Sequence, residues 1–202
     1  EKPQVQFEPV TSSAQQIGIM GGTFNPVHLA HLSMAEQVRK QLHLDEIWFI
    51  PNNTPPHKKI AGNISTKDRR AMLELATHDN PHFHVQLFEI MRGGTSYMVD
   101  TLRYLKKRAP RNQYYLIMGS DEVNDFENWR EPETIALLST LVGVRRLNYP
   151  QNPKFPMIWV DAPNLDISSS LIRQNIATGN SIRYLVPESV RLYIESRGLY
   201  RD

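Results

Sequence analysis

Two histidines that follow a pair of glycines form the part of this chain best suited to chemistry. The segment from Gly18 to His31 reads GIMGGTFNPVHLAH, and His28 and His31 have the spacing of neighbours on one helix face. Glycines let backbone N–H groups approach an anion, and a helix N-terminus adds a favourable dipole. Two imidazoles beside such a tight glycine turn predict stabilisation of a phosphate during transfer. The pair alone would equally suit a surface position or half of a metal site.

A second phosphate-binding pattern lies near the end of the chain, where residues 167–173 read ISSSLIR. Ser168 or Ser169 is expected to cap a helix and leave hydroxyl and N–H groups facing outward. Arg173, one turn further on, can place two hydrogen bonds on phosphate oxygens. By itself the segment is typical of a capped helix with a surface arginine. Its presence in the same chain as the first motif favours a phosphate site.

Three further segments carry candidate ligand contacts. In MGSD, Asp121 could accept hydrogen bonds from ribose hydroxyls or cap a helix, and the residues favour neither interpretation. In PNNTPPHKK, His57 and Lys58 could hold a phosphate, with a solvated basic loop as the alternative. In ENWREPE, Trp129 is expected to be an exposed aromatic surface for a flat or cationic ring, and partial burial is the alternative.

The elements that position these segments alternate between strands and helices. The expected strands are Ile17–Met20, Glu46–Pro51, His84–Leu87, Gln113–Met118, Leu141–Val144 and Met157–Val160. The expected helices are Ala30–Gln41, Thr66–Thr77, Met98–Arg108, Pro132–Leu138, Ser169–Thr178 and Pro187–Arg197, with Pro187 inside the last one. This order predicts a single α/β domain with a Rossmann-like, doubly wound, mostly parallel sheet and helices on both faces. Ligands bind such sheets at the carboxyl ends of the strands, where the glycine turn lies.

Composition narrows the class of protein. The 202 residues carry a net charge of +2, too small a bias to indicate binding to nucleic acid or to a membrane surface. There is no cysteine, and we assign no metal ligands to the protein. No apolar run approaches the ~18 residues of a membrane span, so a cytoplasmic protein is expected. We expect residues 1–16 to form a polar extension and residues 17–202 to form the domain.

Taken in order, the motifs resemble those of the nucleotidyltransferase α/β phosphodiesterase superfamily and, within it, the bacterial nicotinate-nucleotide adenylyltransferases. The resemblance runs from Ile17 to Tyr200 through GGTFNPVHLAH, IWFIPNNTPPHKK, RRAMLELA, GTSYMVDTL, IMGSD, ISSSLIR and RGLY. It implies adenylyl transfer from ATP to nicotinate mononucleotide, which gives nicotinate adenine dinucleotide and pyrophosphate in NAD biosynthesis. Mg²⁺ would bind mainly through the ATP phosphates. The alternatives are transfer to the amide mononucleotide and a nucleotide-binding regulator without turnover, and a homo-oligomer is one further expectation.

The resemblance also implies a role for individual residues. Catalysis is assigned to His28, His31 and Arg173. The ATP site would comprise Gly21, Gly22, Thr23, Phe24, His28, His31, Gly119, Asp121, Ile167, Ser168, Ser169, Ser170 and Arg173. The mononucleotide site would comprise Asn52, His57, Lys58, Thr95, Ser96, Tyr97, Trp129 and Arg130.

Four positions depart from the family pattern. Asn25 stands where aspartate is usual, and Ala30 replaces the glycine of the HxGH pair. Met98 occupies the place of a threonine that contacts the nicotinate group, and Arg130 follows Trp129 where tyrosine is common. A phosphate monoester is largely dianionic at neutral pH, so it can attack the α-phosphorus without a general base. We expect a protonated His28 or His31 to donate to the α-phosphate, and a preference for the acid over the amide mononucleotide.

Overall fold

The structure is a computed structural model that describes residues 14–145 and 154–202. One sheet of six parallel strands has the order β3-β2-β1-β4-β5-β6. The order reverses between β1 and β4, which is the topological switch point of a doubly wound sheet. The predicted Rossmann-like α/β fold is therefore confirmed. The strands are β1 (Gln16–Gly22), β2 (Glu46–Pro51), β3 (Phe83–Val85), β4 (Gln113–Met118), β5 (Thr140–Arg145) and β6 (Ile158–Asp161).

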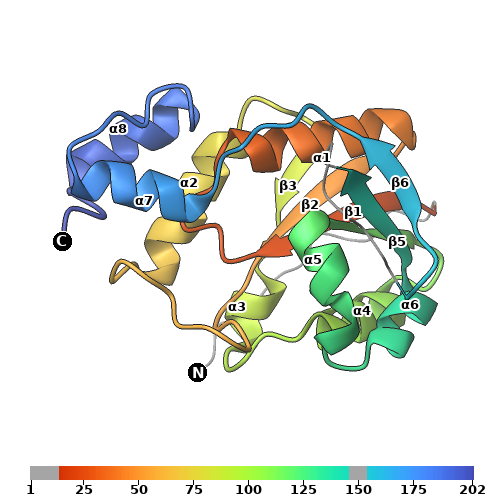
Figure 1. Cartoon of the computed structure of the whole chain (residues 1–202). Helices are drawn as coiled ribbons and strands as arrows, with labels where there is room; N and C mark the ends of the chain where they lie inside the picture. The colour runs from red at the N-terminus through yellow and green to blue at the C-terminus, as the bar shows by residue number, and fades with distance from the viewer. Residues whose placement is uncertain (1–13, 146–153) are drawn as a thin grey trace.

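Helices pack on both faces of this sheet and form two separate hydrophobic cores (Figure 1). One core holds residues of α1 (Leu29–Gln41), α2 (Thr66–Thr77), α7 (Ser169–Ala177) and α8 (Glu188–Arg197). The other holds residues of α3 (Phe88–Arg92), α4 (Met98–Arg108), α5 (Ser120–Asp125), the 3₁₀ turn η1 (Phe126–Asn128) and α6 (Pro132–Leu138).

The first strand shows how the sequence produces two cores. Ile17 and Ile19 are fully buried in the core with α4, whereas Met20 is buried in the core with α1, as alternation along a strand requires. Between them, a Cβ added at Gly18 would lie 2.5 Å from Ile47 Cδ1 and 3.1 Å from Leu44 Cδ1. A glycine at this position therefore lets β2 and its neighbours pack closely on β1.

Some boundaries differ from the expectation, each for a local reason. The third strand ends early, at Val85, because α3 begins three residues later at Phe88. The hydrophobic periodicity of the sequence did not indicate α3. The second unexpected helix, α5, follows β4 directly with Gly119 as its N-cap. Pro187 lies outside the last helix, since its ψ of 146° makes it the N-cap and α8 begins at Glu188.

The first strand begins slightly earlier than expected. Residues 1–13 of the expected extension lie outside the described residues, but Gln16 already belongs to β1. The backbone N–H of Gln15 also donates to Asn112 Oδ1 at 3.0 Å. Among the helices that the structure describes, none has the length and apolar character needed to cross a membrane.

Candidate active site

The turn after β1, residues 23–28 and hereafter the β1 turn, lies at the switch point of the sheet. The prediction of a glycine turn is wrong in detail, because Gly21 and Gly22 are the last residues of β1 and the positive φ of 51° falls on Phe24. The buried Phe24 ring packs edge-on against His31 and Phe49, and this burial compensates the backbone strain. Gly21 instead makes room for α4, since an added Cβ would lie 2.7 Å from Met98 Cε.

The two histidines meet at the start of α1. His28 is the N-cap and thus precedes the helix, whereas His31 lies in its first turn. Their rings stack with centroids 3.7 Å apart. The backbone N–H of His28 donates to His31 Nδ1 at 3.2 Å, so that nitrogen carries no hydrogen and the neutral His31 ring holds its hydrogen on Nε2.

Burial in the ligand-free protein favours the neutral form of both imidazoles. Burial lowers the pKa of His28 to about 4. Burial, and second the neighbouring His28, hold the pKa of His31 well below its usual value of 6.5. The stacked, desolvated pair disfavours a positive charge on either ring. A neutral His31 still offers its Nε2–H as a donor, and His28 Nδ1 is buried without a partner among the described residues.

The second phosphate-binding pattern lies directly against the first. Ser169 Oγ donates to the carbonyl of Pro26 at 2.8 Å, and Arg173 Nη1 donates to the carbonyl of Asn25 at 2.8 Å. The same guanidinium donates through Nη2 to Ser170 Oγ at 3.2 Å. The β1 turn and the start of α7 therefore meet at one end of the sheet, although they lie far apart in the sequence.

Within this segment Ser168, not Ser169, is the N-cap of α7. Its Oγ accepts from the N–H of Leu171 at 3.1 Å, which leaves the Ser169 hydroxyl to hold the β1 turn. The half-buried Ile167, just before the cap, packs against the core beneath α1. Side-chain capping and core packing thus fix how the N-terminus of α7 approaches the β1 turn.

Asn25 connects three segments through its side-chain amide. Tyr200 Oη donates to Asn25 Oδ1 at 2.6 Å, and Asn25 Nδ2 donates to the carbonyl of Ala61 at 2.7 Å. Burial raises the pKa of Tyr200 strongly, so its hydroxyl stays protonated and can donate. An ionised aspartate could accept from Tyr200 but could not donate to Ala61. The departure from the family pattern at this position therefore removes a charge and adds a bond to the loop after β2.

Hydrogen bonds attach the loop after β2 to the β1 turn. This loop comprises residues 52–64 and is hereafter the β2 loop. The buried Asn52 donates through Nδ2 to Thr23 Oγ1 at 3.0 Å. The fully buried Arg69 of α2 donates to the carbonyls of Thr23 and Asn52, both at 2.8 Å. Sequence reasoning missed Arg69, although the signal is present: it shares the apolar face of α2 with Met72 and Leu73, at helical spacing.

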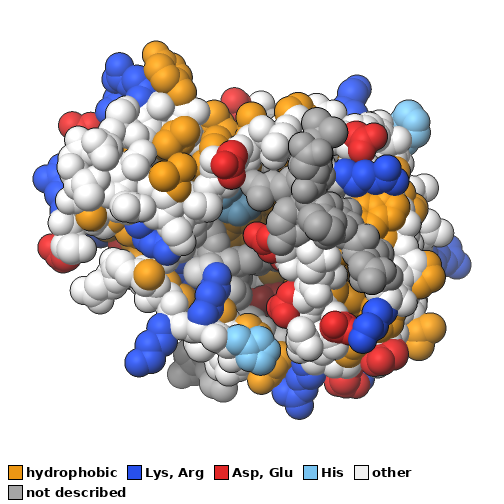
Figure 2. All heavy atoms as spheres, viewed as in Figure 1, with side chains coloured by type: hydrophobic (Ala, Val, Ile, Leu, Met, Phe, Trp, Pro, Cys, Tyr) orange, Lys and Arg blue, Asp and Glu red, His pale blue; other side chains and the backbone are white. Residues whose placement is uncertain are grey.

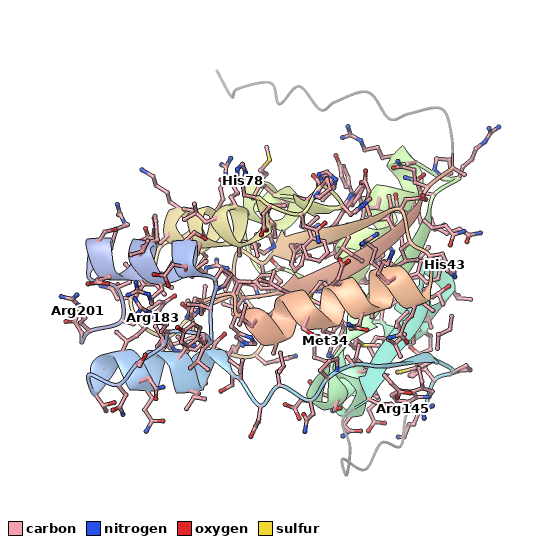
Figure 3. The ribbon with its side chains drawn as sticks, turned by 90° about the horizontal axis from the view of Figure 1, so that it is seen from above. Met34, His43, His78, Arg145, Arg183 and Arg201 are labelled. Atoms are coloured by element: carbon pink, nitrogen blue, oxygen red, sulfur yellow. The ribbon has the colours of Figure 1, made fainter. Side chains whose placement is uncertain are left out.

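The outer part of the β2 loop reaches toward α5. His57 and Lys58 are exposed, and Lys58 lies close enough to Glu122 to oppose the effect of burial, which raises the pKa of Glu122 to about 7. The alternative that Asp121 caps a helix is wrong, because Gly119 is the N-cap and Asp121 lies in the first turn. A Cβ added at Gly119 would have Met34 Sδ as its nearest neighbour, at 4.0 Å, so the space there is open. Figure 3 labels Met34 on α1.

The segment 95–97 between α3 and α4 is bound to the β2 loop. The exposed Thr95 pairs with Thr54 in an isolated bridge. Ser96 is buried, its N–H donates to the carbonyl of Thr54 at 2.8 Å, and its Oγ accepts from the N–H of Asn53 at 2.9 Å. The Ser96 hydroxyl is therefore engaged within the protein, where it supports the β2 loop.

Aromatic and cationic side chains gather beside this segment. The guanidinium carbon of Arg130 lies 4.4 Å from the centroid of the Tyr97 ring. The interpretation of Trp129 as an exposed surface is wrong, and partial burial is the observed alternative. Its ring packs at 60° to Phe126 with centroids 5.3 Å apart, because η1 draws this part of the chain onto the core beside α4.

Hydrogen bonds and a cation–ring contact join these segments to one another. Figure 2 shows a hollow of the surface between α7 and α5, with histidine, acidic and basic side chains beside it. The two phosphate-binding patterns lie together by direct hydrogen bonds, and residues 95–97 join them through the β2 loop. The arrangement provides backbone N–H groups, two neutral imidazoles and a guanidinium at the switch point, a set suited to a polyphosphate.

Comparison with known proteins gives a consistent result. The cytidylyltransferase-like family matches residues 19–175. A probable nicotinate-nucleotide adenylyltransferase of Lactiplantibacillus plantarum is 48% identical over 200 residues, which cover 98% of this chain and 95% of the relative. A probable enzyme of the same name from Enterococcus faecalis is 46% identical over 98% of this chain and 91% of its own length. Among solved structures, Plasmodium falciparum nicotinic acid mononucleotide adenylyltransferase complexed with NaAD shares the fold, with a TM-score of 0.78, 22% identity and coverage of 92% of this chain and 97% of that chain.

Proposed function

This chain belongs to the cytidylyltransferase-like family and, within it, to the nicotinate-nucleotide adenylyltransferases, and from this premise we propose its reaction. It transfers the adenylyl group of ATP to nicotinate mononucleotide and releases pyrophosphate. The mononucleotide phosphate oxygen forms a bond to the α-phosphorus, and the bond from that phosphorus to the bridging oxygen of the β-phosphate breaks. The product is nicotinate adenine dinucleotide.

One observation carries this proposal: the β1 turn and the start of α7 are hydrogen-bonded to each other at the switch point. A triphosphate lying across both would meet the N-terminus of α1, the N-terminus of α7 and the Arg173 guanidinium. Each of these groups favours negative charge. Positioning and charge stabilisation are the principal contributions that phosphoryl transfer needs from a protein.

The histidine pair acts in this scheme as a donor, not as a base. His31 Nε2–H donates to the α-phosphate, because its Nδ1 is already occupied by the N–H of His28. A dianionic mononucleotide phosphate needs no proton removed before it attacks. The charge that develops on the α-phosphate and on the departing pyrophosphate is met by fixed donors that need no reorganisation.

Mg²⁺ would be bound mainly through the ATP phosphates, since it keeps water and phosphate oxygens as most of its ligands. When bound, it neutralises charge on the triphosphate. The described residues contain no group of three or more His, Cys, Asp or Glu side chains placed to hold a metal ion. The donors at the β1 turn and Arg173 would contact phosphate oxygens of the nucleotide directly.

The acceptor is held on the other side of the hollow. Its phosphate lies by the β2 loop, near Asn52, His57 and Lys58. Its pyridine ring lies by Tyr97 and Trp129, where a cationic ring gains a favourable contact with an aromatic surface. The Arg130 guanidinium and nearby backbone N–H groups attract the nicotinate carboxylate. The amide analogue would leave these donors imperfectly paired.

The test is pyrophosphate release from ATP with a panel of acceptors: nicotinate mononucleotide, nicotinamide mononucleotide, phosphopantetheine and glycerol phosphate. We expect a kcat/KM for the acid mononucleotide at least about 100-fold above that for the amide. Comparable values for the two would refute the acid preference while keeping adenylyl transfer. ATP binding without pyrophosphate release from any acceptor would favour the regulator instead.

A further inference from the structure

Among the residues that the structure describes, Arg69 is a buried cation without a carboxylate partner. Its side chain is fully buried, burial lowers its pKa, and within the described residues it forms no salt bridge. The adjacent Asp68 turns away and accepts instead from Tyr193 at 2.6 Å and from Arg197 at 2.9 Å. Burying an unpaired charge is expensive unless hydrogen bonds compensate it. The acceptors of those compensating hydrogen bonds therefore indicate the role of Arg69.

All the acceptors of Arg69 belong to the two segments assigned to phosphates. Nη1 donates to the Thr23 carbonyl at 2.8 Å and to Asn52 Oδ1 at 3.3 Å. Nη2 donates to the carbonyls of Asn52 and Asn53, at 2.8 and 3.3 Å. The planar fork of an arginine can hold both segments at once, which the single ammonium of a lysine cannot do in the same geometry.

These bonds fix the orientation of the Asn52 amide. Because Asn52 Oδ1 accepts from Arg69, its Nδ2 points the other way and donates to Thr23 Oγ1 at 3.0 Å. Thr23 Oγ1 is thereby an acceptor, and its own hydrogen must be directed elsewhere. Among the described residues no acceptor for that hydrogen is found. Thr23 is the first residue of the β1 turn, so a ligand in that turn can receive the bond.

We propose that Arg69 is a positioning residue: it sets the direction of the relay from Arg69 through Asn52 to Thr23, so that the Thr23 hydroxyl donates to a nucleotide phosphate. This inference rests on the proposed function and deepens it. The relay is preorganised because its first member is buried and cannot reorient, and its last member presents a donor before the ligand arrives. A purely structural arginine would hold the two segments together without any effect that depends on the Thr23 hydroxyl.

That difference is measurable by a double-mutant cycle. The variants Arg69→Lys, Thr23→Val and their combination are compared for MgATP affinity by calorimetry and for kcat and KM in pyrophosphate release. We expect each single change to weaken ATP affinity about 10-fold, the scale of one hydrogen bond to a charged group. The combination should be within about 2-fold of Thr23→Val alone, because the two changes remove the same bond. Multiplied losses, or an Arg69→Lys affinity within 2-fold of the wild type, would overturn the proposal.

A second cycle replaces Asn52 and leaves Arg69 in place, so that the buried arginine keeps its hydrogen bonds and the variant is expected to fold. Asn52→Asp keeps an oxygen for Arg69, removes the donor to Thr23 and adds a negative charge beside the Arg69 guanidinium, so the Thr23 hydroxyl turns toward the new carboxylate. We expect unchanged or higher resistance to urea together with a roughly 10-fold weaker ATP affinity, and a much smaller effect in the Thr23→Val background. An equal effect in both backgrounds would instead reflect the added charge alone and would contradict the relay.

Two controls separate this inference from the proposed function. Arg70→Lys changes the next residue of α2, whose exposed side chain pairs with Glu74 at 2.9 Å, and should leave ATP affinity unchanged. ATP binding requires no turnover, so the cycles decide the relay even if no acceptor yields pyrophosphate. Failure of the wild type to release pyrophosphate refutes the proposed reaction, whereas additive cycles refute only the relay.

Discussion

In the β1 turn, Thr23, Asn25 and His28 are all buried, and hydrogen bonds tie the turn to α7, to α2 and to Tyr200. Across the hollow, Thr95 and Arg130 are exposed, and Arg130 is held by a contact with the Tyr97 ring. We call the first region, together with the start of α7, the phosphate side. The second, residues 95–97 and 129–130, is the pyridine side.

The two regions differ in how firmly their side chains are held before a ligand binds. The phosphate side has donors that are fixed before any ligand binds, as electrostatic stabilisation of a transferring group requires. The pyridine side has exposed side chains that can adjust to the ring they bind, and the buried member, Ser96, serves the β2 loop. Substitutions on the phosphate side should therefore act on kcat and on ATP affinity, and those on the pyridine side mainly on the KM for the mononucleotide.

The sharpest test of the phosphate side is His31→Ala. Loss of a preorganised donor to the α-phosphate should lower kcat by roughly 10²–10³, with little change in the KM for the mononucleotide. Steady-state pyrophosphate release measures both. His78→Ala, which changes an exposed histidine just beyond α2 (Figure 3), is the matched control and should behave as the wild type. A His31→Ala enzyme that kept most of its kcat would contradict the role of His31 as a preorganised donor on the phosphate side.

Glu89 is a buried residue of α3 that interacts with Ser96 of the pyridine side. Burial raises the pKa of this carboxyl from 4.5 to about 7, against the opposing effect of Thr101, whose Oγ1 donates to Glu89 Oε2 at 2.8 Å. The folded protein thus holds a proton that the unfolded chain releases. The stability from this proton is fully present below pH 4.5 and is lost as pH rises through about 7.

Glu89→Gln removes that dependence. Relative to the wild type, the variant should gain stability progressively between pH 4.5 and 7, by at most roughly 3 kcal/mol at pH 8. Urea unfolding at several pH values measures this difference. His28 and His31 titrate with the opposite sign because their pKa values are lowered, but they are present in both proteins and cancel. A difference that stays constant from pH 5 to 8 would show that Glu89 is not the group that titrates.

Much of the scaffold could be predicted from local patterns. The bounds predicted for β2 and α2 are those observed, since β2 is a continuous apolar run and α2 follows the Ser65 cap, and both are local properties. The carboxyl ends of parallel strands lie at one edge of a sheet, which places the two phosphate-binding motifs near each other, and Ser169 contacts Pro26.

The remainder depends on contacts that a local pattern does not encode. Asn25 is read from sequence as a lost charge, and only its bonds to Tyr200 and Ala61 show what it gains. The short α3 and α5 gave no periodic signal, since a helix of one or two turns depends on packing. The neutral state of His31 follows from desolvation in the folded protein, which spacing alone does not show.

The smallest expected effect belongs to Arg130, and it tests whether the two sides are separable. Arg130→Ala removes an exposed guanidinium, and an exposed pair of a guanidinium and a carboxylate is worth about 0.2–1 kcal/mol. The KM for nicotinate mononucleotide should therefore rise only about 3-fold, while kcat and the KM for ATP stay unchanged. Arg111→Ala, at an exposed position before β4, controls for loss of surface charge. If Arg130→Ala lowered kcat 10-fold or raised the KM for ATP equally, the pyridine side would be coupled to the transfer step, and the division between the two regions would not hold.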